Sequence, residues 1–509
     1  MPAALASRAA ADPEGTFLIH GDEVVTFGQM ETRAEALAAS LHGLGIECGD
    51  RVAVAMPSWP ECVIAMFAVA KLGAVVVPLN PRLTADDLRY TLRHSEAVAA
   101  ITAETVGDLD FLQLFEELLV QLPELQYLIT VGEEDRWYDD RVFQFEDLLS
   151  AGGGRDYSAN SPPSADEVFA IVYTAGTTGE PKGVELTHAN LLQVAGSTVD
   201  DLGLTRDDRV VGIMALFHVF GLGPGILGSL LSGATLVLQD EFGPAGALDP
   251  VERHRATVHY GVPTLFIAKL REQEKAPRDL SSLRRGLVAG APVSDEFMKA
   301  AEENICPDLL IAYSLTETSS TVCLTRPDDP EAKRIFTVGR LLKNNDVKIV
   351  DPDGTELPME SLGEIAVRGP GVMRGYYRQP RETSSLFDSD GYFLTGDLGM
   401  EDEEGCIHLV GRKKEVIISS GSNVCPREVE DRLQSHPAIR EAICACVLPE
   451  EGAIVTGQEI QDWCSVTLAA YKVPDDVQFM GEFPLTGTGR VQRGELSHLI
   501  RAAHAEPKT

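Results

Sequence analysis

No apolar run in this chain is long enough to cross a bilayer, and residues 1–14 contain no apolar segment of the kind found in secretory signals. Cysteines with zinc-type spacing are also missing. The nine cysteines are scattered singly, except for Cys444 and Cys446. An odd number of scattered thiols is typical of a reducing compartment. These absences predict a cytoplasmic protein that neither spans a membrane nor is exported.

Positive charge is scarce, with 43 Lys and Arg against 78 Asp and Glu and a formal net charge of −35. Such a chain repels nucleic acids and anionic membranes, so neither is expected as a partner. Solubility is the simpler explanation of this charge. At 509 residues the chain is too long for one core, and 44% apolar with 24% charged content is typical of a globular protein. We therefore expect at least two domains.

Short apolar segments alternate with helical patterns over much of the chain. The expected strands are Val52–Met56, Val75–Pro78, Ala97–Thr102, Tyr127–Val131, Phe169–Tyr173, Val210–Met214, Thr235–Leu238 and Leu309–Ala312. Helical patterns occur at Met30–Leu44 and Val63–Leu72. This alternation predicts α/β layers with largely parallel sheets.

From Asp346 onward the pattern changes to short strands separated by Gly/Asp turns, which favours a small antiparallel, barrel-like subdomain. We expect a large domain at 1–410, made of α/β subdomains to about 345 and the barrel-like subdomain at 346–410. A hinge at 411–414 ends at Lys414, and a small α+β domain follows at 415–509, with a helix at Pro426–Gln434.

The segment from Tyr173 to Gly183 is the most informative part of the sequence. It follows an apolar run, and its chemistry suits phosphate: flexible glycines that let backbone N–H groups form an anion-binding nest, hydroxyl donors and one cation. These residues are Thr174, Gly176, Thr177, Thr178, Gly179 and Lys182. The spacing is not that of a Walker A sequence. A plain Gly/Thr-rich surface turn is the alternative, which eleven residues of this composition behind a buried-strand pattern make improbable.

This segment resembles the phosphate-binding loop of the adenylate-forming superfamily, which includes acyl-CoA synthetases, luciferases and nonribosomal-peptide adenylation domains. The resemblance runs from Leu18 to Arg493, with the segments in family order, and points to the acyl-CoA ligase branch. It implies a large domain hinged to a small mobile one. It also implies two half-reactions: a carboxylic acid and ATP form an acyl-adenylate, and CoA then forms the thioester. The implied ligands are ATP or acyl-AMP, CoA and, if adenylation is retained, Mg²⁺.

Two segments resemble the family's acyl and adenine pockets. His218 lies in a Phe-His-x-Phe-Gly pattern, where the resemblance implies a gate for thiol access. By itself this residue is more typical of a core histidine. Gly290, Ala291 and Pro292 match the turn against which the family packs adenine, although a Gly-Ala-Pro sequence alone is only a turn.

The segment Tyr313-Ser314-Leu315-Thr316-Glu317 follows a buried-strand pattern, a position where doubly wound folds bind ligands. Attack of a carboxylate on the α-phosphate brings two anions together, so a Mg²⁺ ion near the triphosphate is needed. The resemblance implies Glu317 as the magnesium ligand, Thr316 at the α-phosphate and Tyr313 stacked on adenine. A helix N-cap is the alternative for Thr316 and Glu317. Ser314 stands where the family has glycine, and its side chain narrows the expected acyl pocket.

The remaining matches concern ribose, hinge and pantetheine. Asp397 ends a Thr-Gly-Asp sequence, and its two carboxylate oxygens suit vicinal ribose hydroxyls. Arg412 would complete the ribose and phosphate contacts. Lys414 falls at the hinge position, and Gly421 would lie against pantetheine, because only a glycine permits such close approach. The family's usual glycine pair is Ser420-Gly421 here.

One substitution changes the expected mechanism. Arg490 stands where the family carries its adenylation lysine, which contacts the substrate carboxylate and the phosphate together. A wide planar guanidinium cannot occupy the position of a compact ammonium. Misplacement by about 1 Å can cost on the order of 100-fold in rate. Residues 443–466 also lack the extra turn and strand typical of relatives, so the small domain is shortened. We therefore expect weak or absent adenylation.

The resulting hypothesis is an acyl-CoA ligase that takes a ready-made acyl-adenylate and forms the CoA thioester, with a separate adenylating enzyme as its supplier. A complete ATP-dependent synthetase, a non-catalytic nucleotide-binding relative and transfer to a carrier-protein thiol are the alternatives. The expected acid is apolar and bulky, because its pocket would be lined mostly by small or apolar residues. These are His218, Val219, Gly221, Val262, Ala291 and Ser314. A monomer or a homodimer is expected.

Overall fold

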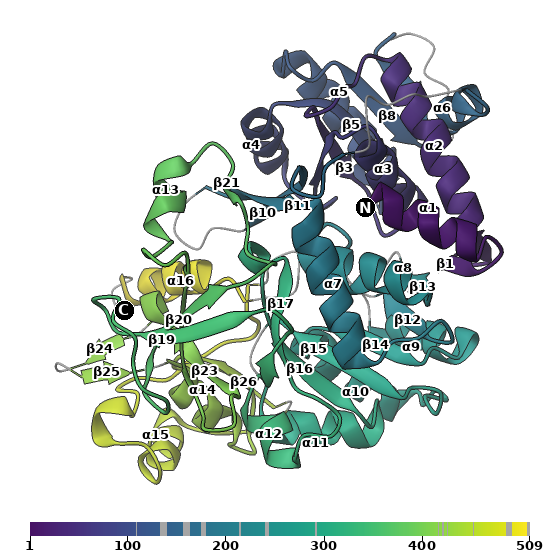
Figure 1. Cartoon of the computed structure of the whole chain (residues 1–509). Helices are drawn as coiled ribbons and strands as arrows, with labels where there is room; N and C mark the ends of the chain where they lie inside the picture. The colour runs from purple at the N-terminus through teal and green to yellow at the C-terminus, as the bar shows by residue number, and fades with distance from the viewer. Residues whose placement is uncertain are drawn as a thin grey trace.

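The computed structural model describes residues 1–107, 109–132, 140–155, 163–174, 180–212, 215–239, 244–290, 293–415, 417–419, 422–424, 426–450, 452–484 and 491–505. Two large sheets dominate the first three quarters of the chain, a four-stranded sheet follows, and the C-terminal segment lies beside it at the lower left of Figure 1.

Sheet A has nine strands in the order β18-β17-β16-β15-β14-β12-β13-β1-β2. They are β1 (Thr16–His20), β2 (Glu23–Thr26), β12 (Arg209–Gly212), β13 (Thr235–Leu238), β14 (Val258–Gly261), β15 (Arg285–Ala289), β16 (Leu309–Leu315), β17 (Ser320–Leu324) and β18 (Arg340–Leu341). The pairs from β16 to β1 are parallel, and both edges are antiparallel.

Sheet B has eight strands in the order β21-β11-β10-β4-β3-β5-β8-β9. They are β3 (Arg51–Ala55), β4 (Val75–Pro78), β5 (Ala97–Ala103), β8 (Tyr127–Val131), β9 (Val142–Gln144), β10 (Val168–Thr174), β11 (Lys182–Thr187) and β21 (Gly375–Tyr376). The pairs from β10 to β9 are parallel. The predicted α/β class with largely parallel sheets is therefore confirmed.

Helices connect and cover these sheets. They are α1 (Pro2–Ala11), α2 (Phe27–Gly43), α3 (Pro60–Lys71), α4 (Ala85–Ser95), α5 (Phe111–Gln121), α6 (Phe145–Gly152), α7 (His188–Leu202), η1 (Gly221–Leu227), α8 (Gly228–Ser232), α9 (Pro244–His254), α10 (Pro263–Lys275), α11 (Asp295–Asn304), η2 (Thr316–Thr318), α12 (Glu331–Phe336) and α13 (Pro380–Ser385). A minor hairpin is formed by β6 (Thr105–Val106) and β7 (Leu109–Asp110). Capping boxes begin α2, α4 and α7, because each has a threonine at the N-cap and a polar partner three residues later.

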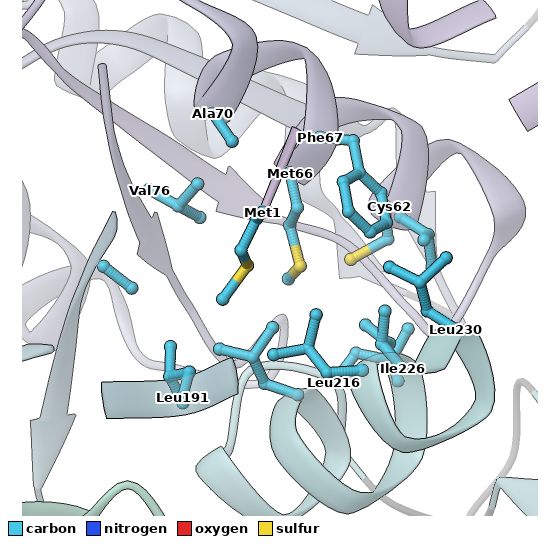
Figure 2. Packing of buried hydrophobic residues seen from close by; sticks show 14 of the residues in the cluster. Met1, Cys62, Met66, Phe67, Ala70, Val76, Leu191, Leu216, Ile226 and Leu230 are labelled. Carbon is cyan, nitrogen blue, oxygen red and sulfur yellow. The ribbon is translucent and has the colours of Figure 1, made fainter. Parts of the chain in front are cut away.

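The main core lies between sheets A and B. Helix α3 is apolar on all sides, and only Glu61 and Lys71 of its residues are not buried. Figure 2 shows its Met66 packed in one cluster with Met1, Leu216 and Ile226. Because this cluster joins the N-terminus, α3 and η1, the two sheets are held as one packed unit.

The four-stranded sheet C is antiparallel, in the order β19-β20-β22-β23, and follows Asp346 as expected. Its strands are β19 (Asp346–Val350), β20 (Gly363–Arg368), β22 (Phe393–Glu401) and β23 (Ile407–Arg412). In the described residues β19 and β23 are its end strands and do not pair with each other, so its likeness to a barrel is limited to the antiparallel pairing.

The C-terminal segment begins with η3 (Lys413–Glu415) and the hairpin β24 (Ile417–Ser419) and β25 (Ser422–Val424). It continues with α14 (Pro426–Gln434), β26 (Ile439–Ile443), β27 (Cys446–Pro449), α15 (Gly457–Ser465), η4 (Ala470–Lys472), β28 (Gln478–Phe479) and α16 (Arg493–Ala505). The strands β26, β27 and β28 form a three-stranded sheet with its own small apolar core. Helix α14 has the predicted bounds.

Candidate nucleotide site

The ends of strands from all three sheets meet at one place. The hairpin of β10 and β11 belongs to sheet B, and Thr174 pairs with Lys182 at the end where the glycine-rich segment connects the two strands. The hydroxyl of Thr174 donates to the Lys182 carbonyl at 3.4 Å. The Lys182 ammonium lies 4.8 Å from the ring centre of Tyr376, on the neighbouring strand β21. A cation is thus fixed at the exit of the glycine-rich segment.

Glu317 lies in η2, directly after β16 of sheet A. The Tyr376 hydroxyl donates a hydrogen bond to its carboxylate at 2.8 Å, and the Met373 N–H donates to its carbonyl at 2.8 Å. Burial, and then the Glu317 charge, raises the pKa of Tyr376, so this phenol stays a donor at physiological pH. The alternative of a side-chain N-cap is not observed, because Leu315 is the N-cap residue of η2 and makes no such bond.

Tyr376 is the site residue that the sequence analysis missed. It joins Glu317 to the strand that carries Lys182, through one hydrogen bond and one cation–π contact. The only local signal was the pair Tyr376-Tyr377 after a glycine. That glycine is required, because a Cβ atom on Gly375 would lie 2.8 Å from the Thr383 side chain.

Asp397 connects sheet C to sheet A. The residue is 3% exposed, and its carboxylate accepts a hydrogen bond from the Tyr313 hydroxyl at 2.7 Å and pairs with the Arg412 Nε atom at 3.0 Å. Arg412 is its partner across the β22–β23 pair. Burial raises the pKa of Asp397; Arg412 and Tyr313 oppose the shift, while the negative charge of Glu317 adds to it. The predicted Tyr313, Asp397, Arg412 and Glu317 therefore form one electrostatic cluster.

The segment predicted as a hinge runs beside this cluster. Burial, and then the charge of Arg412, lowers the pKa of Lys414, while Glu415, Asp397 and Glu317 oppose the shift. Lys413 forms an ion pair with Glu364 of sheet C at 2.8 Å. The ammonium of Lys414 is thus within the electrostatic range of both carboxylates of the site.

A second set of contacts holds the start of α16 near the same segment. Arg493 makes two hydrogen bonds to the Glu430 carboxylate, at 2.8 and 3.0 Å, and lies 3.8 Å from Glu415. A bidentate guanidinium–carboxylate pair fixes both position and orientation. The chain just after Arg490 is therefore tied to α14 and to η3.

His218 lies in the turn before η1, half-buried, with its ring 6.2 Å from that of Phe217. The following Gly221 is tightly enclosed, because a Cβ atom there would lie 2.4 Å from the Ala215 carbonyl oxygen. Gly290 directly follows β15 and has a φ of +91°, a conformation that favours glycine. Ser314 and Thr316 are partly buried on the same edge of sheet A.

Several predicted site residues lie outside the described residues. They are Gly176, Thr177, Thr178, Gly179, Ala291, Pro292, Gly421 and Arg490.

A divalent cation at this site would be bound by one protein carboxylate, that of Glu317. Among the described residues, no group of three or more His, Cys, Asp or Glu side chains could hold a metal ion by itself. The donor set, Glu317 beside a cationic segment, suits Mg²⁺ bound through one carboxylate, phosphate oxygens and water. The residues present therefore fit magnesium bound together with a nucleotide.

An α/β unit with a nucleotide-type cluster at its strand ends, followed by a small α+β unit, defines the class. Residues 5–377 match the family described as AMP-binding enzyme, and residues 428–490 match the AMP-binding enzyme C-terminal domain. The chain belongs to this family, in the acyl-CoA ligase branch of the adenylate-forming superfamily.

Full-length relatives support this assignment. The chain is 33% identical to the putative acyl-CoA synthetase YngI of Bacillus subtilis (strain 168), over 97% of this chain and 95% of that one. It is 33% identical to a feruloyl-CoA synthase of an Amycolatopsis species, over 96% of both chains.

Solved structures agree. The anthranilate CoA ligase AuaEII in complex with anthranoyl-AMP has a TM-score of 0.91 at 26% identity, covering 99% of this chain and 98% of that chain. ATP-bound MatB from Rhodopseudomonas palustris has a TM-score of 0.87 at 26% identity, covering 99% of both chains. Among the helices that the structure describes, none combines the length and apolar character needed to cross a membrane.

Proposed function

We propose that this chain is an acyl-CoA ligase that forms a thioester from an acyl-adenylate and CoA, and that its own adenylation step is weak or absent. The observation that carries the proposal is Arg490, at the position of the family's adenylation lysine. The guanidinium keeps the charge but cannot place it at the same point between the acid and the phosphate. A separate adenylating enzyme would then supply the intermediate.

The residues of the cluster have separate roles in this proposal. Asp397 and Arg412 bind ribose and phosphate, and Tyr313 lies against adenine while its hydroxyl orients Asp397. In the thioester step the CoA sulfur bonds to the acyl carbonyl carbon, the bond from that carbon to the AMP oxygen breaks, and the thiol proton passes to water. Gly421 lines the path of the pantetheine arm, His218 gates it, and Lys414 allows the small domain to turn.

A complete ATP-dependent synthetase is the second candidate, and a specific observation favours it. Lys182 and Glu317 are both held by Tyr376, although the family uses such residues for the triphosphate and its metal. Glu317 would hold Mg²⁺, with Thr316 and the glycine-rich segment on the phosphates; the ion would neutralise phosphate charge. This arrangement has no use in an enzyme that never binds ATP.

The two candidates differ in their starting materials, which gives the decisive experiment. The purified native chain is supplied with a synthetic apolar acyl-adenylate and CoA, or with the free acid, ATP, Mg²⁺ and CoA, and thioester formation is followed by chromatography. We expect turnover from the adenylate to be at least about 100-fold faster. Equal, fast turnover by both routes would establish the complete synthetase instead.

Two further outcomes have defined meanings. Binding of acyl-adenylate without transfer to any thiol would indicate the non-catalytic relative. Transfer to a holo-carrier protein in preference to CoA would reassign the acceptor, because both acceptors present the same pantetheine thiol. Robust acid-dependent exchange of labelled pyrophosphate into ATP would contradict the proposed loss of adenylation.

A further inference from the structure

Helix α4 lies against both ends of the glycine-rich segment, although nothing in the family assignment gives it a role there. Tyr90 and His94 are four residues apart, so they project from the same face of the helix. Their rings stack with a centroid distance of 5.6 Å. One face of α4 therefore presents two polar aromatic groups as a single unit.

The exit of the segment contacts Tyr90. The Tyr90 hydroxyl donates to the Pro181 carbonyl at 3.1 Å, one residue before Lys182. Burial, and then the adjacent Glu180 carboxylate, raises the pKa of Tyr90, so the hydroxyl keeps its proton and remains a donor. Pro181 has no N–H of its own, and its carbonyl is the group through which α4 holds the exit.

The entrance of the segment contacts His94. Its Nδ1 atom and the Tyr173 hydroxyl share a hydrogen bond at 2.7 Å. Burial of Tyr173 raises its pKa well above the ordinary value, so that phenol also stays protonated. The ring of Tyr377 packs edge-on against His94 at 5.8 Å, and the Tyr377 N–H donates to the Gly183 carbonyl at 2.7 Å.

The helix itself is firmly placed. A capping box between Thr84 and Asp87 begins it, and Leu88 and Leu92 are buried beneath it. Glu96, its C-cap residue, forms ion pairs with Arg51 at 3.3 Å and with Arg378 at 2.7 Å. A residue that contacts α4 is therefore held against a helix whose own position is fixed by packing and ion pairs.

We propose that Tyr90 and His94 are positioning residues for the phosphate-binding loop: together they fix its entrance at Tyr173 and its exit at Pro181. Backbone N–H groups bind phosphate well only when several of them point at one place, which requires both ends of the loop to be set. The inference rests on the proposed assignment of this segment to phosphate. It concerns the terminal phosphates of a nucleoside triphosphate, which AMP lacks.

The test compares ATP and AMP binding by calorimetry, with the full chain and without acid or CoA. The variants are Tyr90→Phe, which removes one hydroxyl, His94→Gln and the double variant. We expect the Kd of Mg-ATP to rise about 5-fold in each single variant and about 20-fold in the double variant. The Kd of AMP should stay within about 2-fold, because AMP does not reach the loop. Tyr127→Phe is the matched control, since it removes a phenol hydroxyl from the far part of sheet B.

Equal losses for ATP and AMP, or no loss for either, would overturn the proposal. A purely structural role would lower the unfolding temperature and weaken both nucleotides alike, so thermal unfolding is measured in parallel. If one variant does not fold, the other single variant carries the same comparison. If the native protein binds ATP and AMP with the same Kd, the assignment of this segment to phosphate is wrong, and the proposal fails with it. Slow or fast adenylation would alter neither Kd, so the result is independent of the thioester assay.

Discussion

The proposed nucleotide cluster of the large domain and the segment from Arg490 to Arg493 in the small domain differ in how far they match the family pattern. Around Asp397, Tyr313 and Arg412 contact the two carboxylate oxygens. In the small domain Arg493 is fixed by Glu430, whereas Arg490, three residues earlier, stands where the family pattern has lysine. Under the proposed function, the nucleotide site serves both half-reactions, whereas the lysine that Arg490 replaces serves only the first. The comparison therefore predicts that this chain keeps nucleotide binding and loses adenylation.

The largest effect is expected from Asp397→Asn. The amide loses the charge that pairs with Arg412, in a site that is almost fully buried, so AMP binding should weaken by about 100-fold or more and both routes to thioester should fail. Calorimetric titration with AMP measures this. Asp346→Asn is a matched control, because Asp346 also accepts from a tyrosine and an arginine, Tyr392 and Arg368, on the same sheet. An unchanged Kd for AMP in the Asp397 variant would remove this cluster from the nucleotide site.

Arg490→Lys should speed the route that starts from free acid and ATP and leave the route that starts from acyl-adenylate unchanged. Restoring the compact ammonium is expected to raise acid-dependent pyrophosphate release by about 30-fold, while thioester formation from acyl-adenylate stays within about 2-fold. A coupled pyrophosphate assay measures the first rate. Arg440→Lys, an exposed site on β26, is the control. A variant no faster than the native chain would show that Arg490 does not limit adenylation.

Tyr376→Phe should have a smaller and more specific effect. Loss of its hydrogen bond frees the Glu317 carboxylate to turn, so the Mg²⁺ concentration that half-saturates ATP binding should rise about 5-fold, with AMP binding unchanged. Titration of ATP binding against Mg²⁺ measures this. Tyr392→Phe removes a comparable phenol–carboxylate bond from sheet C and should leave the magnesium dependence as it is. A shift in both variants would indicate a general loss of stability.

The smallest effect on activity is expected from Lys269→Met. Lys269 and its contact His259 are fully buried, and burial lowers the pKa of both. In the unfolded chain Lys269 takes up a proton below about pH 10.5 and His259 below about pH 6.5, whereas in the folded chain each does so only at a lower pH. Between its unfolded and its folded pKa, each group therefore binds a proton more readily in the unfolded chain. The free energy of unfolding falls as the pH falls through that range.

Methionine at position 269 removes the cost of burying the lysine amine and fills a similar volume in the core. Its free energy of unfolding should rise by about 1–3 kcal/mol near neutral pH, with turnover unchanged. Urea denaturation at several pH values measures the gain, and Lys275→Met, at the exposed end of α10, is the control. A loss of stability at every pH would mean that the buried amine makes a favourable contact.

Much of the fold followed from the sequence because its signals are local. Buried parallel strands appear as short apolar runs, and the predicted Val75–Pro78 and Tyr127–Val131 coincide with β4 and β8. Asp397 and Arg412 could be proposed from motif order, and the structure places them opposite each other.

The missed residues depend on pairings across the chain. Tyr376 reaches Glu317 only because β21 joins the edge of sheet B beside β11. Tyr90 reaches Pro181 only because α4 packs against the loop end of the β10–β11 hairpin, which is distant from α4 in sequence. Neither contact leaves a periodic or compositional trace. The predicted stacking of Tyr313 on adenine stays a prediction, and what the structure adds is a phenol hydroxyl committed to Asp397.

The order of the site residues along the chain has a consequence for biosynthesis. The residues of the candidate site lie on, or directly after, strands of three sheets: Lys182, Glu317, Tyr376, Asp397 and Arg412. The last of them, Arg412, ends β23. A growing polypeptide that has not yet emerged through Arg412 lacks part of the proposed nucleotide cluster, so we expect no stabilisation by ATP or AMP at that stage. We therefore expect the large domain to fold on its apolar packing, and a nucleotide to stabilise the proposed site only after it has been assembled.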